Sequence, residues 1–306
     1  MADWTGVRGK RVLITGATNG IGLSAAEALA ALGAKLAIVA RSRAKATTAV
    51  ARISAAGPAG TEVDVLSADL SSQRSVRDLA ADALARYPTI DVLINNAGAM
   101  YTTRELTGDG IELSWALNVL APFLLTTLLL DRLKGSSHAR VITTTSDAHK
   151  GNVIPFDDLD ASASYARRGY ARYGQTKLAD ILFTVELARR LQGTGVTANC
   201  VHPGFVATGF NRNNGVFMDF VMTLTRPFAR TPTKGAETLV WLASSPEVSD
   251  QTGGYFVDKR RAMPSRPAQD ADAARRLWEV MEQQTRASDA PGAGATTAAA
   301  SRTAPR

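Results

Sequence analysis

The sequence predicts one α/β domain, a doubly wound sheet of seven mostly parallel strands with helices on both faces. Three observations carry this prediction. Short apolar runs alternate with longer segments of helical periodicity from residue 11 to residue 257. The first of these runs leads directly into a glycine-rich loop and a helix. Apolar residues make up 45% of the 306-residue chain, which is enough to bury a full core.

The first βαβ unit consists of a strand at residues 11–15, a glycine loop at 16–22, a helix at 21–32 and a strand at 35–40. Its glycines are spaced G-x-x-x-G-x-G, which differs from the G-x-G-x-x-G dinucleotide fingerprint. The physical chemistry is the same, because glycine lets the backbone approach a pyrophosphate and the helix N-terminus offers free N–H donors. We therefore predict a dinucleotide site here, against the alternative of a tight turn without a ligand.

The remaining expected elements continue the alternation. Strands are expected at 62–67, 91–95, 140–145, 197–202 and 254–257, and helices at 72–87, 109–133, 165–192 and 233–243. Residues 113–130 carry no charge and reach the lower length limit for a membrane span. Asn118 and Pro122 within them favour a buried or interface helix, so no membrane span is expected. The first ten residues show no signal peptide, and the expected location is cytoplasmic.

Glycine and polar residues follow most of the predicted strands, where parallel sheets bind their ligands. They are Gly16 to Gly22, Arg41, Asp69, Asn96 to Gly98, Ser146, and Pro203 with Gly204. Arg41 follows the second strand, at the position that meets the adenosine ribose. A carboxylate there would accept from a 2′-hydroxyl, whereas arginine suits a 2′-phosphate. Arg41 therefore favours NADP over NAD, against the alternative of a solvated arginine that begins a helix.

Tyr173 and Lys177 are four residues apart in the helix expected at 165–192, so they lie on one face of it. Alone, such a pair is more often two surface residues of an amphipathic helix. Ser146 alone is likewise more often a loop serine that caps a helix. A catalytic role for these residues becomes the better interpretation because the other polar motifs of the chain lie at strand ends.

The composition excludes several other classes. A single cysteine, Cys200, rules out a disulfide framework and a Cys-based zinc site. Three histidines lack a metal-ligand spacing, so no metal is expected. The net charge of +7 comes from dispersed residues without an aromatic-studded basic cluster, which argues against nucleic-acid binding.

In order and spacing, residues 10–257 resemble the short-chain dehydrogenase/reductase family. The resemblance is carried by Thr15-Gly-x-x-x-Gly-x-Gly22, Asp69, Asn95-Asn-Ala-Gly98, Asn118, Ser146, Tyr173-x-x-x-Lys177 and Pro203-Gly204. Within the family the chain is most similar to the retinol dehydrogenase-like group, through Thr145-Ser-Asp-Ala-His149, Phe156-Asp-Asp-Leu159, Val201-His-Pro-Gly204 and the stretch from Tyr173 to Phe183. Two departures are Thr143-Thr-Thr145, where the family often has Asn-x-Ser, and the absence of the anchoring N-terminal helix of animal members.

The resemblance implies a Rossmann fold with Asn118, Ser146, Tyr173 and Lys177 as catalytic residues. Tyr173 would be the general acid in reduction and the general base in oxidation. Lys177 and a positive nicotinamide would lower the tyrosine pKa from its ordinary ~10, and Lys177 would bind the nicotinamide ribose. Ser146 would donate to the carbonyl oxygen. The expected NADP contacts are Gly16, Thr18, Asn19, Gly20, Ile21, Gly22, Arg41, Asp69, Leu70, Asn96, Ala97, Gly98, Tyr173, Lys177, Pro203, Gly204, Val206 and Thr208.

Pro122 predicts an irregularity in the helix that carries Asn118. Proline has no N–H to close the α-helical bond to the carbonyl four residues back, which belongs to Asn118. The helix should therefore kink near Asn118 and leave that carbonyl free. In the family, this asparagine is thought to hold a water that links the lysine to solvent, and Pro122 offers a local reason for a free acceptor there.

Residues 205–231 are the least family-like segment and are expected to shape the substrate site as a lid. Aromatic and methionine side chains there suit a lipophilic carbonyl, although packing against the core or a partner chain is nearly as good an explanation. The candidate substrate contacts are His149, Phe205, Phe210 and Phe217. A homodimer could form through residues 113–130 and the Tyr173 helix.

Together these features predict an NADP-binding catalytic domain at residues 1–258, a helical extension at 259–286 and a disordered tail at 287–306. The expected function is NADP(H)-dependent interconversion of a lipophilic aldehyde or ketone and its alcohol, with a tyrosine general acid/base. The alternative is a catalytically silent NADP-binding regulator or scaffold on the same fold. The sequence does not distinguish retinoid, steroid and polyketide substrates, nor the physiological direction.

Overall fold

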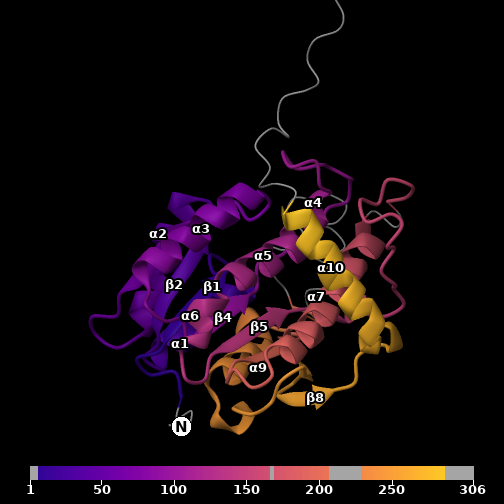
Figure 1. The fold of residues 1–306 in the computed structure, drawn as a ribbon. Coiled ribbons are helices and arrows are strands. Elements are labelled where there is room, and N and C mark those ends of the chain that lie inside the picture. Colours follow the sequence, from indigo (N-terminus) through magenta and orange to yellow (C-terminus); the bar gives the residue numbers. More distant parts are fainter. Residues whose placement is uncertain (1–5, 166–168, 207–228, 287–306) are drawn as a thin grey trace, which may run out of the picture.

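The computed structural model describes residues 6–165, 169–206 and 229–286. These residues form an eight-stranded sheet in the order β3-β2-β1-β4-β5-β6-β7-β8, with helices on both faces (Figure 1). Strands β1 to β7 pair in parallel, and β8 pairs antiparallel with β7. The predicted doubly wound α/β fold is confirmed.

The strands lie where apolar runs predicted them, with ends that differ by one residue at most. They are β1 Arg11–Thr15, β2 Lys35–Ala40, β3 Val63–Ser67, β4 Val92–Asn95, β5 Arg140–Thr144, β6 Thr197–Val201 and β7 Tyr255–Val257. The prediction of seven strands was wrong by one, because β8, Arg260–Ala262, was missed. This strand has only three residues, two of them exposed arginines, and its turn uses Asp258 and Lys259 at positive φ where a hairpin usually has Asn or Gly.

Two hydrophobic cores lie on opposite faces of the sheet. Helices α1 (Gly20–Ala31), α2 (Arg43–Ala56) and α9 (Pro232–Ser244) cover one face. Helices α3 (Gln73–Arg86), α5 (Ala121–Leu128), α7 (Tyr170–Arg190) and α10 (Ala271–Arg286) cover the other. Short helical turns are η2 (Asp147–His149), η6 (Pro246–Val248) and η7 (Arg266–Gln269). Helix α2 was not among the predicted elements.

The single helix predicted at residues 109–133 is broken into four pieces. They are α4 (Leu113–Trp115), the π-helical η1 (Ala116–Leu120), α5 and α6 (Leu130–Lys134). The N–H of Ala121 bonds to the carbonyl five residues back, on Ala116, so the ladder changes register just before Pro122. The irregularity predicted from Pro122 therefore lies in the segment that carries Asn118. Within the described residues, no helix is long and apolar enough to cross a bilayer.

Helix α10 lies alongside α7 and reaches α5 (Figure 1). Its Trp278 meets Phe123 of α5 edge-on at 5.0 Å between ring centroids and stacks on Phe183 of α7 at 6.0 Å. All three rings are buried. The chain's own C-terminal helix thus covers part of the α5–α7 face that we predicted as a dimer interface.

Candidate active site

The glycine loop between β1 and α1 has a shape that only glycine allows. Gly16 and Gly20 have φ of +69° and +53°, a region that other residues rarely adopt. A Cβ on Gly22 would lie 2.3 Å from the carbonyl oxygen of Gly16. Asn19 precedes α1 in an extended conformation, and its side chain makes no capping bond to the helix. The N–H groups of the first turn of α1 therefore face the loop without a side-chain partner from Asn19.

The side chain of Asn96, which follows β4, links the carboxyl ends of β1, β4 and β5. Its Nδ2 donates to the carbonyls of Thr15 and Gly16, both at 3.2 Å, and its Oδ1 accepts from Thr144 Oγ1 at 3.3 Å. Thr15 Oγ1 in turn accepts from the backbone N–H of Asn96 and Ala97, both at 3.0 Å. The side chain of Asn96, which we predicted as a cofactor contact, is used here to hold the glycine loop.

Arg41 and Asp69 lie together at the ends of β2 and β3. Arg41 Nη1 is 3.8 Å from Asp69 Oδ2, and the Arg41 side chain is 75% exposed. Burial alone would raise the pKa of Asp69, but hydrogen bonds from Ser71 and the charge of Arg41 lower it below its usual value. The neighbouring Leu70 is partly buried against the core.

Three structural elements bring the predicted catalytic side chains together. Asn118 comes from η1, Ser146 follows β5, and Tyr173 and Lys177 lie on α7. Ser146 is hydrogen-bonded to Tyr173, and Lys177 Nζ lies 5.7 Å from the centroid of the tyrosine ring. A Cβ on Gly98 would lie 3.2 Å from Asn118 Oδ1 and 3.5 Å from Lys177 Nζ, so the end of β4 also meets this group.

Asn118 is buried and links η1 to both neighbouring segments. Its Nδ2 donates to the carbonyl of Ala99 at 2.8 Å and to Thr176 Oγ1 at 3.1 Å. Its Oδ1 accepts from the N–H of Ala99 at 2.9 Å. The amide thus fixes the loop after β4 against α7, one residue away from Lys177.

Lys177 is held by two acceptors. Its Nζ donates to the carbonyl of Thr144 at 3.0 Å and to Asp180 Oδ2 at 2.8 Å. Burial lowers the pKa of Lys177, but the Asp180 carboxylate outweighs this and raises it above the ordinary value. Burial raises the pKa of Asp180 to about 6, although Lys177 opposes the shift. The two groups lie at the distance of an ion pair, with both side chains buried.

The Tyr173 phenol is protonated at neutral pH in this structure. Burial raises the pKa of Tyr173, and the charge of Lys177 and the hydrogen bond with Ser146 offset only part of the increase. The sequence-based expectation of a lowered pKa concerned the complex with an oxidised nicotinamide. In the ligand-free protein Lys177 lowers the pKa of Tyr173 as expected, and burial outweighs this effect. A protonated phenol suits a general acid.

His149 does not present a surface to a substrate. The side chain is 0% exposed and meets Tyr255 edge-on at 5.4 Å. Its Nδ1 lies 2.7 Å from the carbonyl of Ser146, and its Nε2 accepts from the N–H of Ser265 at 3.1 Å. The ring therefore links the Ser146 loop to the C-terminal extension, and this position does not favour the predicted substrate contact.

The segment after β6 turns at Pro203 and at Gly204, whose φ is +83°. Val206 forms an isolated bridge with Arg230 and packs against Gly235 at the start of α9, where Ile21 of α1 also lies. This places residues 203–206 beside the glycine loop. Phe205 is 50% exposed. Thr208, Phe210 and Phe217, with most of the predicted lid, lie outside the described residues.

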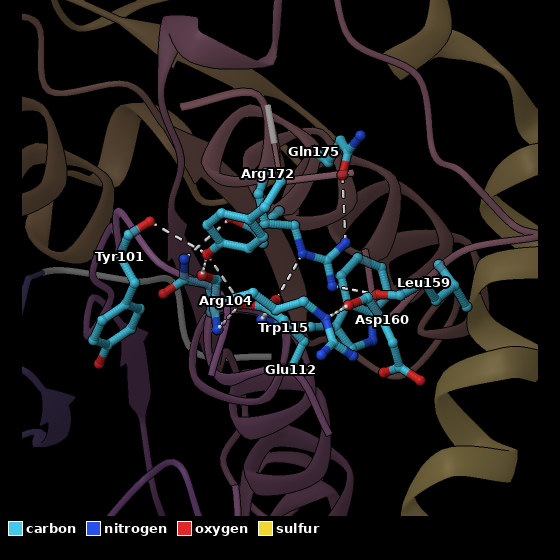
Figure 2. Close-up of polar contacts among 12 residues, drawn as sticks. Tyr101, Arg104, Glu112, Trp115, Leu159, Asp160, Arg172 and Gln175 are labelled. Atoms are coloured by element: carbon cyan, nitrogen blue, oxygen red, sulfur yellow. Dashed lines mark hydrogen bonds and ion pairs between the residues drawn. The ribbon is translucent and has the colours of Figure 1, made fainter. Parts of the chain in front are cut away.

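A buried ion pair at the start of α7, which sequence reasoning missed, holds this helix in place (Figure 2). Arg172 Nε donates to Glu112 Oε2 at 2.7 Å, and both side chains are almost fully buried. Glu112 also accepts from the backbone N–H of Ser114 and Trp115, which caps α4. Figure 2 shows these side chains facing one another beside the loops of Tyr101 and Leu159. The only feature of the sequence that pointed to this ion pair was the position of Arg172 directly before Tyr173.

The fold, the glycine loop and the Ser146–Tyr173–Lys177 group together define a class of protein. A family model described as short chain dehydrogenase matches residues 10–217. The chain belongs to this family, whose members are oxidoreductases that use a nicotinamide cofactor.

Comparison with individual relatives shows to which group of the family the chain belongs. It is 40% identical to retinol dehydrogenase 14 of Mus musculus, over 90% of this chain and 86% of that protein. It is 42% identical to retinol dehydrogenase 12 of Homo sapiens, over 89% and 85%. It is also 42% identical to DnrU of Streptomyces sp. (strain C5), provisionally named a daunorubicin C-13 ketoreductase, over 90% and 92%. The chain is therefore a retinol dehydrogenase-like oxidoreductase that acts between carbonyl and alcohol.

Solved structures agree with the fold. A crystal structure of a protein from Mycobacterium paratuberculosis has a TM-score of 0.74 and 31% identity, covering 93% of this chain and 96% of that one. RhlG of Pseudomonas aeruginosa, solved as an active-site complex with NADP, has a TM-score of 0.66 and 27% identity, covering 84% and 97%. Among the described residues of this chain, no cluster of three or more His, Cys, Asp or Glu could hold a metal ion.

Proposed function

We propose that the chain is an NADP(H)-dependent enzyme that interconverts a lipophilic aldehyde or ketone and its alcohol, with Tyr173 as the general acid/base. The observation that carries this proposal is the Ser146–Tyr173–Lys177 group beside the glycine loop. The residues present fit a dinucleotide, because the loop leaves no room for a side chain at Gly22 and the first turn of α1 carries no acidic residue.

The bound cofactor would supply the hydride. In reduction, Tyr173 would give its phenolic proton to the carbonyl oxygen as charge develops there, and Ser146 would donate a hydrogen bond to the same oxygen. Lys177 would hold the nicotinamide ribose and stabilise the phenolate that remains. In oxidation, the same phenolate would accept the proton of the alcohol. Asn118 would keep the loop of Ala99 and helix α7 in register around these groups.

The preference for NADP rests on Arg41. Its guanidinium is largely exposed at the end of β2, where it can reach a 2′-phosphate. The NADP complex of RhlG among the similar structures supports the same choice.

The lipophilic substrate is proposed from the relatives and from Phe205. Retinol is the substrate named for two relatives, and a ketone is named for DnrU. Phe205 is half-exposed directly after Pro203 and Gly204, where an apolar substrate could cover it. A cytoplasmic location and a homodimer stay predictions.

The test is turnover with NADPH and a panel of retinoid, steroid and polyketide-type carbonyls, followed at the nicotinamide absorbance. Tyr173→Phe removes the proton donor and should lower kcat by about a hundredfold or more. The matched control is Tyr87→Phe, which loses a phenol that bonds to Asp64, away from the site, and should leave kcat unchanged. Cofactor binding without turnover of any carbonyl would contradict the proposal and favour the regulatory or scaffold alternative.

A further inference from the structure

Asp180 is a buried carboxylate next to Lys177 that the reaction described above does not use. Its Oδ2 accepts from Lys177 Nζ at 2.8 Å, and the two side chains are only 2% and 6% exposed. Asp180 lies three residues after the lysine on the same buried face of α7. A carboxylate in the apolar core costs free energy, so its presence beside a catalytic lysine calls for a reason.

Few charged or titratable groups face this carboxylate. On α7 they are Lys177 and Tyr173, both of which feel its charge. From β6, Cys200 faces it, and burial first and the Asp180 charge second raise the thiol pKa. Among the described residues, Lys177 is the one cation in an ion pair with Asp180.

The contacts of Lys177 leave one direction open. An ammonium has three N–H donors. Two point to the carbonyl of Thr144 and to Asp180, which are fixed parts of β5 and α7. The third remains for the cofactor or for the oxygen of Tyr173. Asp180 therefore both aims the ammonium and partly cancels its charge at the phenol.

Resting on the proposed function, we infer that Asp180 is a positioning residue that sets the proton balance of the site: its carboxylate fixes the Lys177 ammonium and raises the pH at which the Tyr173–Lys177 pair begins to lose protons. This favours the general acid form of the tyrosine, and with it the reduction of a carbonyl.

The direction of the effect does not depend on which group loses its proton. Tyr173 and Lys177 are coupled, so protons leave the pair in steps that belong to both residues. Removing a nearby negative charge makes the first proton easier to release, whether the phenol or the ammonium gives it up. A neutral residue at position 180 must therefore lower the first pKa of the pair.

The direct test is a spectroscopic titration of Tyr173 without cofactor. Phenolate absorbance is followed against pH in protein with Tyr173 and in Tyr173→Phe, and the difference reports this one tyrosine. Asp180→Asn keeps the shape of the side chain without the charge, and should move the onset of ionisation down by about one pH unit or more. Asp180→Glu keeps the charge and should restore most of the original curve. Asp180→Ala is a second neutral variant, small enough to admit a water beside Lys177 Nζ, and should shift in the same direction.

The matched control is Asp91→Asn. Asp91 is also a largely buried aspartate, bonded to Arg11 N–H and Ser136 Oγ, but it lies before β4 at the opposite end of the sheet. Its variant should leave the Tyr173 curve unchanged. A curve that stays in place or moves to higher pH in folded Asp180→Asn would overturn the inference, since a purely structural role predicts lower stability without that downward shift.

Enzyme kinetics provide a second test of the role of Asp180. In a pH profile of carbonyl reduction, Asp180→Asn should lose activity at a pH about one unit lower than the unaltered protein does. This experiment needs turnover, whereas the titration does not. A protein without carbonyl turnover whose Tyr173 curve still moves would therefore disprove the proposed function and leave the role of Asp180 standing.

Discussion

Arg41 is the residue on which the cofactor preference depends. Replacing it with aspartate would remove the guanidinium and place a second carboxylate beside Asp69, which now lies 3.8 Å from Arg41. A charge-assisted bond to phosphate contributes about 1.5–3 kcal/mol, so Arg41→Asp should lower the ratio of kcat/KM for NADPH over NADH by about tenfold to a hundredfold. The control is Arg52→Asp on α2, whose arginine pairs with Glu27. An unchanged ratio in Arg41→Asp would contradict the NADP assignment.

Individual residues were predictable where their chemistry is local in sequence. Gly16, Gly22, Tyr173 and Lys177 follow from spacing within one loop or one helix. Asp180 was visible only as a carboxylate in an apolar run, and its partner became clear once the buried face of α7 was known. The lowering effect of Lys177 on the Tyr173 pKa was predictable from their spacing. The opposing effect of burial was not, because burial depends on elements distant in sequence.

The ion pair of Glu112 and Arg172 acts at the scale of elements, because it joins α4 to the first turn of α7. Arg172→Met would leave Glu112 as an unpaired buried charge, and should lower the free energy of unfolding by about 3–5 kcal/mol. Urea denaturation measures this change. Arg86→Met is the control, since Arg86 pairs with Asp82 on the surface of α3 and should cost less than about 1 kcal/mol. Equal losses in both variants would show that the buried pair does not hold the helices together.

The boundaries of the helices were less predictable than their existence, because contacts with residues distant in sequence set them. Apolar periodicity continued the Tyr173 helix back to residue 165, but α7 begins at Tyr170. Gly169 precedes it at a φ of +77°, and a Cβ there would lie 1.8 Å from the carbonyl of Tyr101. The break in the Asn118 helix was predictable because Pro122 imposes it locally. Its start at Leu113 was not, because the cap is Glu112, held by Arg172 sixty residues away.

At the scale of the whole molecule, the C-terminal extension contacts the catalytic half of the sheet at several points, two of which are hydrogen bonds next to predicted catalytic residues. The N–H of Ser265 donates to His149, next to the Ser146 loop. Gln284 on α10 accepts from the indole N–H of Trp115, directly before the Asn118 segment. These contacts span 116 and 169 residues of sequence, so no local pattern could have predicted them. Alternation alone was enough for the fold class, because it needs only the order of strands and helices.

Trp278 joins the extension to the core through two aromatic contacts, and it tests whether α10 is part of the fold. The indole packs between Phe123 and Phe183, and Arg190 lies 4.3 Å over its ring. Trp278→Ala would leave a cavity lined by these rings, and should lower the free energy of unfolding by about 3–5 kcal/mol in urea denaturation. Trp278→Phe keeps an aromatic ring there and should lose less. If Trp278→Ala unfolds at the same urea concentration as the unaltered protein, α10 does not stabilise the α5–α7 face, and that face is again open to a second copy of the chain.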